Sequence, residues 1–450
     1  MSTSDSTIED DDDSISQLLL RENKHYRELR RIRSSLAFRL GTTIVNSIKF
    51  PPKLLILPFL LLFIGFDWGL ERIGKKKFNQ DDFDIINSNN RNCVIMFPTN
   101  GVGFGHFTRL LAIAKRMKEK DPELEIVFFS TMSTMHLLKE HGIIGYRIPG
   151  RKEYQDSTTT SWNAILEESL SLVFAAHKPK LFVFDGAFPY RGMLNTIKER
   201  KNIAKVWVRR GTFKKKATKI PKDSLNHFDH IVRPKDSITS DVSKEILYGL
   251  EVSYCNPIIL CDPTELVSKK IARTRLGLRD GMFVVYIQLG AGNINDIDNV
   301  ISNCISILNS KKNIRIVIGE SMIGSRMEFE GSQLQILRDY PNSMYFNAFD
   351  FAIIAGGYNS YHEVIHHNLP SICIPNTKTG MDDQLARAKA AASQNAIIVI
   401  EEPNKNNLTL AIEQALNPEM RSAMKIAMET LVLPNGASEA ADFFNKLIND

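Results

Sequence analysis

The chain repeats one pattern twice: a continuous apolar run, a glycine-rich turn, and a segment with helical periodicity. The first half starts this pattern at CVIMF, residues 93–97, and the second half restarts it at FVVYIQL, residues 283–289. Apolar runs that alternate with amphipathic helices are typical of a parallel sheet covered on both faces. We therefore expect an α/β fold of two doubly wound, Rossmann-like domains, facing each other across a cleft that holds the ligands.

The expected elements follow from these runs and the segments between them. Strands are expected at 93–97, 125–129, 181–184, 204–208, 283–289, 314–318, 343–346, 351–355, 371–375 and 396–400. Helices are expected near 107–119, 132–141, 162–176 and 190–200, before 309, and over much of 408–449. A chain of 450 residues exceeds one ordinary core. The predicted parts are a disordered acidic tail at 1–17, a basic helix with a short apolar anchor segment at 18–90, and Rossmann-like domains at 91–255 and 256–450, the latter with terminal helices.

The apolar run Leu54–Phe66 raises a separate question. It is 13 residues long and contains Pro58, whereas a membrane-spanning helix needs about 20 apolar residues. Basic sequence precedes it, RENKHYRELRRIR at 21–33, and Lys75–Lys77 follow it. These features favour a helical, membrane-associating extension that lies at the surface of an anionic bilayer. The alternative is a helix buried against the globular body.

Charge and cysteine content narrow the class of protein. The formal net charge of +6 is too small for this length to indicate nucleic-acid binding, so no nucleic-acid partner is expected. The five cysteines are odd in number and form no CxxC pair. A reduced, cytoplasmic compartment is therefore predicted.

The first glycine-rich turn, PTNGVGFGHFTR at 98–109, resembles a dinucleotide loop but departs from it. The third glycine of that pattern is replaced by His106, and the second strand lacks a carboxylate at its end, so no nicotinamide or flavin cofactor is expected. Free N–H groups of Gly101, Gly103 and Gly105 could bind an anion or polar oxygens, with His106 available for chemistry near pH 7. Alternatively, the glycines form a tight turn and His106 packs or caps.

A second constellation lies at 351–376, FAIIAGGYNSYHEVIHHNLPSICIPN. A buried strand ends at Gly356–Gly357, and a helix begins near Asn359–Ser360. Its N-terminus could hold phosphate through free N–H groups, and Glu363, one turn inside, could accept from vicinal hydroxyls. Asp382, Asp383 and Gln384 follow in a loop and first helical turn, and their side chains suit sugar hydroxyls.

In their order and spacing, these motifs resemble GT-B glycosyltransferases, closest to the family of the bacterial peptidoglycan lipid N-acetylglucosaminyltransferase, which is glycosyltransferase family 28-like. NGVGFGHFTR matches that family's glycine-rich loop, with Phe104 where another glycine is common, and QLGAGN at 288–293 is similar to its second glycine turn. AGGYNSYHEVIHHNLPSICIP and DDQ follow the order of its donor signature, and the match covers about 91–450. The stretch from Ser35 to Gly41 also resembles one in cell-surface polysaccharide glycosyltransferases.

The resemblance implies a nucleotide-sugar donor site in the 256–450 domain and an acceptor site in the 91–255 domain. Glu363 would bind the ribose, glycines and polar residues of two turns would face the diphosphate, and an acid–amide pair would hold the sugar. The implied donor residues are Gly290, Gly292, Gly357, Asn359, Ser360, Glu363, Asp383 and Gln384. The residues expected at the acceptor or diphosphate are Gly101, Gly103, Gly105, Arg209 and Arg210.

Two expected catalytic residues belong to the first half. His106 would orient the acceptor or diphosphate, or serve as the base. Asp185 ends a strand and could be the base for an acceptor hydroxyl, or equally cap the next helix. Arg209 and Arg210 also end a strand and could contact a diphosphate, or at least one could be a solvated loop residue. Asp296 and Asp298 suit a first helical turn rather than a metal site, so no metal is expected.

The expected activity is therefore an inverting, metal-independent transfer of a hexose, including an N-acetylhexosamine, from a nucleotide diphosphate sugar such as a UDP-sugar. The acceptor would be a lipid-linked or cell-surface glycan at the cytoplasmic face of a membrane, with peripheral membrane contact and no cofactor beyond the co-substrate. One alternative is a nucleotide-sugar 2-epimerase of the same fold, against which the 1–78 extension counts. Another is a non-catalytic, membrane-associated GT-B scaffold.

Overall fold

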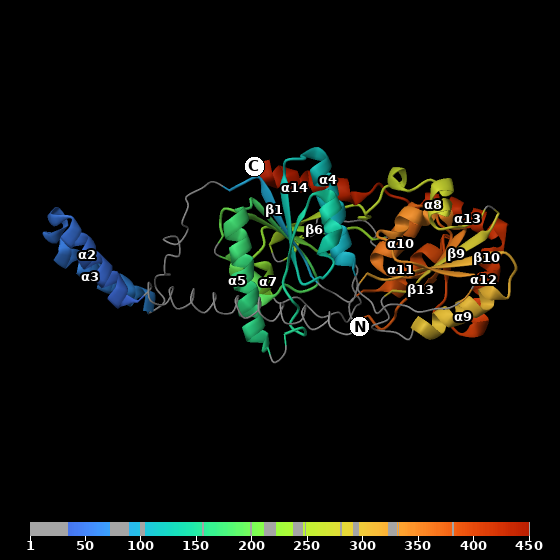
Figure 1. Ribbon diagram of the computed structural model, residues 1–450, viewed down its shortest axis with the longest axis horizontal. Helices are drawn as coiled ribbons and strands as arrows, with labels where there is room; N and C mark the ends of the chain where they lie inside the picture. Colours follow the sequence, from blue (N-terminus) through green and yellow to red (C-terminus); the bar gives the residue numbers. More distant parts are fainter. Residues whose placement is uncertain are drawn as a thin grey trace, which may run out of the picture. The chain divides into compact units, whose positions relative to one another are not determined.

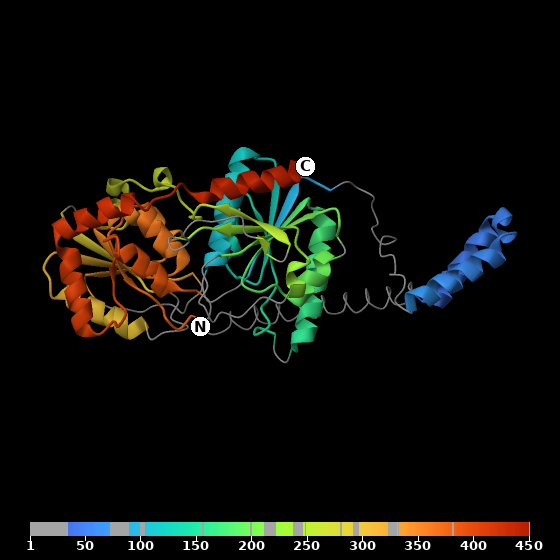
Figure 2. The same cartoon turned by 180° about the vertical axis from the view of Figure 1, so that it is seen from behind.

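A computed structural model describes most of the chain (Figures 1 and 2). The described residues are 35–72, 90–99, 104–154, 157–198, 200–210, 222–236, 246–247, 249–279, 281–290, 297–322, 331, 333–379 and 382–449. They belong to two compact units, Met1–Asn89 and Asn90–Asp450. The predicted acidic tail at 1–17 lies outside the described residues.

The described part of the first unit, residues 35–72, is a helical hairpin. It consists of α2 (Leu36–Lys49), the 3₁₀ turn η1 (Pro51–Leu54) and α3 (Leu57–Arg72). Ser35 caps α2, because its side chain accepts from the Phe38 backbone N–H at 3.3 Å. Within the described residues, no helix combines the length and the apolar character that crossing a membrane requires.

The hairpin exposes large apolar side chains on both helices and on the turn between them. These are Phe38, Ile44, Val45, Ile48, Phe50, Leu54, Leu55, Ile56, Phe59, Leu62, Phe63 and Phe66. A soluble surface carries such residues singly, whereas a contiguous set of them marks an interaction site.

The second unit begins with an eight-stranded sheet in the order β3-β2-β1-β4-β5-β6-β8-β7. All neighbouring strands are parallel except the β7–β8 pair. The strands are β1 (Cys93–Pro98), β2 (Glu125–Ser130), β3 (Ile144–Arg147), β4 (Leu181–Asp185), β5 (Ala204–Val208), β6 (His230–Pro234), β7 (Ile246–Leu247) and β8 (Leu250–Cys255). The strand order reverses between β1 and β4, and ligands of such sheets bind at this switch point.

Helices cover both faces of this sheet. Val94 and Met96 pack with α4 (Gly105–Lys120) and α14 (Gly436–Asn449). Ile95 and Phe97 point to the opposite face, where α5 (Thr159–His177), α6 (Arg191–Lys198) and the short α7 (Lys222–Leu225) cover them. The 3₁₀ helix η3 (Met135–His141) connects β2 to β3. Burial of alternate residues on both faces explains why β1 reads as one continuous apolar run.

The second sheet has six parallel strands in the order β11-β10-β9-β12-β13-β14. They are β9 (Phe283–Gln288), β10 (Ile314–Gly319), β11 (Leu334–Leu337), β12 (Phe351–Ala355), β13 (Ser371–Ile374) and β14 (Ile398–Val399). One face is covered by α8 (Lys269–Arg275), η5 (Asn342–Ala348), α10 (Tyr358–His366), α11 (Gln384–Ala392) and α13 (Pro418–Glu429). The other is covered by α9 (Ile297–Asn309) and α12 (Lys405–Leu416). A short 3₁₀ turn, η4 (Pro263–Glu265), lies in the connection between the sheets.

The last helix, α14, returns to the first sheet (Figure 1). Ala437, Ala440 and Phe444 lie in the same buried cluster as the side chains of α4. A Cβ added at Gly436 would lie 1.9 Å from the Asn256 carbonyl oxygen, so the glycine permits the close approach at the start of this helix. The end of the chain therefore helps to hold the two halves of the second unit together.

The expected α/β class with two doubly wound domains is confirmed. The strand expected at 343–346 was wrong, because these residues belong to the 3₁₀ helix η5, whereas the helix expected near 132–141 is present as the 3₁₀ helix η3. The strands β3, β6, β7, β8 and β11 were missed. β3 is wholly exposed, and β8 and β11 are only partly buried, so they lack the apolar runs that identify central strands. The division at 255/256 remains a prediction.

Candidate active site

The half-buried His106 and the buried Arg109 and Asp185 form a triad at the switch point of the first sheet. His106 lies in the first turn of α4, directly after the β1 turn, and Asp185 is the last residue of β4. His106 Nδ1 lies 2.7 Å from Asp185 Oδ1. Arg109, one turn along α4, donates from Nε to Asp185 Oδ2 at 2.9 Å and from Nη2 to Oδ1 at 2.7 Å. The bidentate pair fixes the carboxylate, which in turn orients the imidazole.

The charges of this triad leave His106 as its neutral member. Burial lowers the pKa of His106, and the nearby Arg109 and Arg210 lower it further, although Asp185 opposes them. Burial alone would raise the pKa of Asp185, but Arg109 and His106 hold it below its usual value. A neutral imidazole that donates from Nδ1 to Asp185 presents Nε2 as a proton acceptor. Asp185 is ion-paired and aimed at His106, which suits an orienting role better than that of the base.

Direct contacts join this triad to the second sheet. α10 begins at Tyr358, directly after Gly356–Gly357 and the end of β12. Asn359 Nδ2 lies 3.5 Å from the Gly105 carbonyl oxygen. The buried Tyr358 ring lies 5.6 Å from both the Arg109 and Arg387 guanidinium groups, and its hydroxyl donates to the Lys235 carbonyl at 2.8 Å. The helix N-terminus expected to face a diphosphate is therefore adjacent to the His106 turn.

Glu363 lies half-buried on α10, one turn inside the helix. Ser343 donates to its Oε1 at 3.3 Å. Burial raises the pKa of Glu363 to about 7, and the Ser343 hydrogen bond opposes this only weakly. A desolvated carboxyl group gains from donors supplied by a ligand, and two vicinal hydroxyl groups would supply them.

A second charged cluster crosses between the two domains. Arg387 of α11 donates from Nε to Asp236 Oδ2 at 2.8 Å, from Nη2 to Asp382 Oδ1 at 2.7 Å, and from Nη1 to the Gly356 carbonyl at 2.8 Å. Asp236 follows β6 of the first sheet, so this pair links the sheets. Arg210 lies 3.3 Å from Asp382 and adds a cation from the end of β5. Burial lowers the pKa of Arg210, with Arg109 and Arg387 acting in the same direction.

The remaining predicted residues take several positions. Asp383 caps α11 by accepting from the Ala386 N–H at 3.1 Å, and the buried Gln384 accepts from the Asn376 N–H at 2.9 Å, so both shape the loop before α11. Ser360 is half-buried on α10, and Gly290 has a φ of 95° directly after β9. The Arg209 guanidinium lies 5.9 Å from the Trp207 ring centroid. Gly101, Gly103, Gly292 and Asp296 lie outside the described residues, and Asp298 lies in the first turn of α9.

Four site residues were missed in the sequence. Arg109 lies three positions after His106, and Arg387 lies three after Gln384, so each is one helical turn from a predicted residue. Tyr358 stands between Gly357 and Asn359 and could have been included on position alone. Asp236 offers no local signal, because only the sheet order brings the end of β6 to α11.

Comparison with known proteins identifies the second domain. Residues 284–444 match the model of the glycosyltransferase family 28 C-terminal domain. This domain belongs to glycosyltransferase family 28. A curated relative from Bacillus licheniformis, UDP-N-acetylglucosamine–N-acetylmuramyl-(pentapeptide) pyrophosphoryl-undecaprenol N-acetylglucosamine transferase, is 27% identical over 198 residues, 41% of this chain. The chain spans 54% of that relative's length.

Several solved structures share the fold that the two sheets of this chain form together. The MurG protein of Acinetobacter baumannii is 15% identical with a TM-score of 0.52, and covers 79% of this chain and 99% of its own. The spinosyn forosaminyltransferase SpnP is 12% identical with a TM-score of 0.56, and covers 81% and 100%. A UDP-N-acetylglucosamine 2-epimerase from Listeria monocytogenes has a TM-score of 0.50 at 12% identity. The expected GT-B arrangement is confirmed.

Proposed function

We propose that the protein is a glycosyltransferase that moves a hexose or N-acetylhexosamine from a nucleotide diphosphate sugar to a lipid-linked or cell-surface glycan. The observation that carries the proposal is the contact between the two switch points. His106, held by Asp185, lies beside the N-terminus of α10 in the family 28 domain through the Gly105–Asn359 contact. Because the curated relative's name specifies UDP-N-acetylglucosamine and an undecaprenyl-linked acceptor, these are the first donor and acceptor classes to test.

The chemistry proposed for this arrangement is a single displacement with inversion and without a metal ion. The acceptor hydroxyl oxygen would bond to the anomeric carbon as the bond from that carbon to the diphosphate oxygen breaks. His106 Nε2 would take the hydroxyl proton, and Asp185 would stabilise the imidazolium that forms. The free N–H groups at the start of α10, with Arg210, would stabilise the leaving diphosphate. Glu363 would accept from the ribose hydroxyls.

The helical hairpin is proposed to bring the enzyme to the cytoplasmic face of a membrane. Exposed apolar side chains occur on α2, η1 and α3, and Arg39, Lys49 and Lys53 lie between them in the sequence. An apolar surface with interspersed cations suits an interfacial position on an anionic bilayer. This position would give the second unit access to a lipid-linked acceptor.

Nucleotide release separates the three candidate functions. Purified full-length protein would be incubated with a panel of nucleotide sugars, led by UDP-N-acetylglucosamine, with and without membrane lipid extract. Transfer predicts nucleotide release that requires the extract, is lost in Glu363→Gln, and persists in Glu413→Gln, a matched change of an exposed glutamate on α12.

Other outcomes would refute transfer. Formation of a 2-epimer without any acceptor would identify an epimerase. If calorimetry detects no binding of any nucleotide sugar in the panel to the wild-type protein, the protein is a non-catalytic scaffold.

A further inference from the structure

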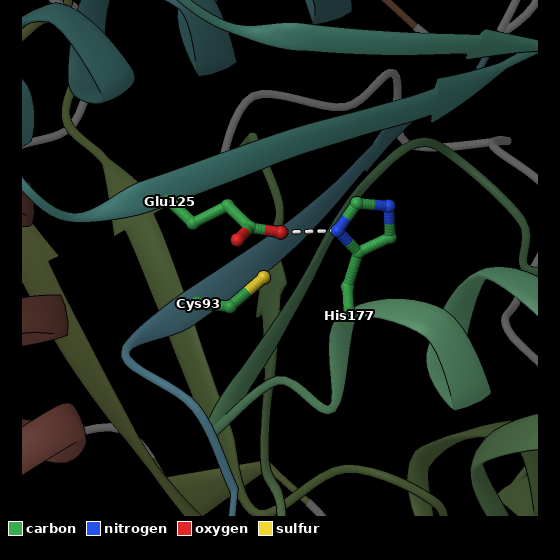
Figure 3. A group of neighbouring side chains, drawn as sticks. All are labelled: Cys93, Glu125 and His177. Carbon is green, nitrogen blue, oxygen red and sulfur yellow. Dashed lines mark hydrogen bonds and ion pairs between the residues drawn. The ribbon is translucent and has the colours of Figure 1, made fainter.

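A cluster of three potential metal ligands lies at the amino ends of the strands of the first sheet, away from the candidate active site. Cys93 begins β1, Glu125 begins β2, and the two are register partners in neighbouring parallel strands. His177 is the last residue of α5. Figure 3 shows the three side chains converging, with the Cys93 sulfur beside the Glu125–His177 contact. The thiol sulfur, a carboxylate oxygen and an imidazole nitrogen lie within 4.8 Å of one another.

The backbone holds these ligands on fixed positions. The Arg91 N–H donates to the Lys178 carbonyl at 2.8 Å, and the Lys180 N–H donates to the Cys93 carbonyl at 3.0 Å. These bonds tie the start of β1 to the end of α5, while the sheet ladder ties it to β2. A site on paired strands and a helix end is more precisely arranged than one on loops.

The two polar atoms of His177 and Glu125 that would not bind the metal already have hydrogen-bond partners. The Tyr146 hydroxyl lies 2.8 Å from His177 Nε2, and Arg91 Nη2 donates to Glu125 Oε2 at 2.8 Å. Metal binding through Nδ1 requires the tautomer with its proton on Nε2, and the Tyr146 hydroxyl oxygen is placed to accept from that Nε2–H. Metal-binding histidines and carboxylates are oriented by such outer partners.

The donor set is one that zinc prefers. A thiolate, an imidazole and a carboxylate are its usual ligands, with bonds of about 2.0–2.3 Å. Tetrahedral bonds of that length place ligand atoms about 3.3–3.8 Å apart. The contact between His177 Nδ1 and Glu125 Oε1 must therefore open to admit the ion, whereas the separations to the Cys93 sulfur need to close by about 1 Å at most. A thiolate, a carboxylate and neutral histidine also balance the two charges of Zn²⁺, which lowers the cost of partial burial.

We propose that Cys93, Glu125 and His177 bind a Zn²⁺ ion, with water as the fourth ligand. Binding replaces the Glu125–His177 contact by two bonds to the metal and releases the Cys93 thiol proton to solvent, with no change of oxidation state. Zinc binds cysteine as the thiolate, so metal binding is coupled to the loss of that proton. The ion would join β1, β2 and α5 at the end of the sheet opposite His106.

Metal content and a cobalt spectrum test the proposal on full-length protein. Chelated and dialysed wild-type protein is expected to take up about one Zn²⁺ per chain, to release protons on zinc addition, and to show a thiolate-to-cobalt absorption band when Co²⁺ replaces zinc. Cys93→Ala should lose the band and the zinc. Cys304→Ala, a change of another fully buried cysteine on α9, should keep both.

Two further variants keep the test independent of folding. His177→Gln changes a residue at a helix end and should abolish the cobalt band. Tyr146→Phe keeps all three ligands and should weaken zinc binding by about tenfold or more, as expected for an outer partner. Absence of a cobalt band in the wild type, or an equal band in His177→Gln, would overturn the proposal. The cluster would then be an ion pair beside a buried thiol.

Discussion

At the scale of single residues, Arg109 decides what Asp185 can do. A carboxylate at the end of a parallel strand is a plausible base, but here both oxygens accept from a buried guanidinium. Its proton affinity is therefore lowered, whereas burial keeps the neighbouring imidazole neutral. The Asp185 carboxylate therefore orients the imidazole, and the imidazole can accept a proton.

This division predicts the behaviour of His106 variants. His106→Ala should lower turnover by about 10²–10⁴-fold, the usual contribution of a positioned base. His136→Ala, a change of an exposed histidine on η3, should leave turnover unchanged. Steady-state rates of nucleotide release provide the measurement. Equal rates for His106→Ala and wild type would make His106 structural.

The pH profile of Asp185→Asn tests the coupling of the same pair. Activity requires neutral His106, so kcat/KM should fall as pH drops through the His106 pKa, which lies below 6.5. Asp185 raises that pKa, and removing its charge should shift the acidic limb to lower pH while turnover falls. A limb that stays in place, or moves to higher pH, would contradict this coupling.

Glu363 should show a trade-off between stability and binding. Its pKa of about 7 in the folded protein lies above its ordinary value of 4.5. The favourable contribution to folding is therefore complete below about pH 4.5 and is lost as pH rises through about 7. At pH 8 the ionised group is a cost, and Glu363→Gln should raise the free energy of unfolding by roughly 1–3 kcal/mol.

Nucleotide binding should respond in the opposite sense. The ionised carboxylate is the form that accepts from ribose hydroxyls, so affinity for UDP should weaken as pH falls below about 7. Glu363→Gln should bind more weakly and lose this pH dependence. Calorimetric titration and urea unfolding at pH 6 and 8 measure both effects. An unchanged affinity in the variant would remove Glu363 from the donor site.

At the scale of elements, the α2–α3 hairpin differs from the other helices in what it exposes. Phe59 is 74% and Phe63 63% exposed on α3. Replacing both with asparagine should weaken sedimentation with anionic vesicles at least tenfold, about 1.4 kcal/mol, which is less than the transfer energy of two aromatic side chains. Leu410→Asn with Ile426→Asn, at similarly exposed sites on α12 and α13, should have no effect.

Salt provides the second readout for the hairpin. Contacts of Arg39, Lys49 and Lys53 with anionic lipid should weaken as ionic strength rises, whereas apolar contacts should not. Vesicle binding by the Phe59→Asn, Phe63→Asn variant equal to that of wild type would show that the hairpin does not carry the membrane contact.

At the scale of the whole molecule, the two domains are joined by buried charge as well as by α14. Burial alone would raise the pKa of Asp236, but Arg387 and His362 hold it well below its usual value. The pair therefore stabilises the protein above about pH 3.8, and this contribution is lost as the pH falls further. Arg387 is fully buried, so loss of the Asp236 charge leaves Asp382 to compensate the cation and leaves the Arg387 Nε–H without its carboxylate acceptor.

Asp236→Asn should consequently lower the free energy of unfolding by about 1–3 kcal/mol. It should also raise the KM for the donor, because Arg387 positions the Gly356 carbonyl and Asp382 beside α10. Asp442→Asn, which removes a partner of Lys120 on the exposed side of α14, should change neither. Urea unfolding and donor titration measure both. A stable variant with unchanged KM would show that the ion pair does not position the site.

The repeated strand–turn–helix pattern determined the fold class, because buried parallel strands require continuous apolar runs and amphipathic helices between them. It also located His106, Asp185 and Glu363, since glycine turns after strands mark the ends at which ligands bind. Exposed edge strands such as β3 could not be predicted in this way, because a strand without a buried face has no apolar pattern in its sequence.

Only the tertiary structure decided which residues meet. Asp236 and Arg387 are separated by 151 positions, and sequence offers no measure of a distance set by strand order and domain contact. The same is true of Arg109 as the partner of Asp185, and of Cys93, Glu125 and His177 at the opposite end of the sheet. Periodicity is a local property of the chain, whereas charge pairing and ligand geometry depend on where the folded backbone places distant side chains.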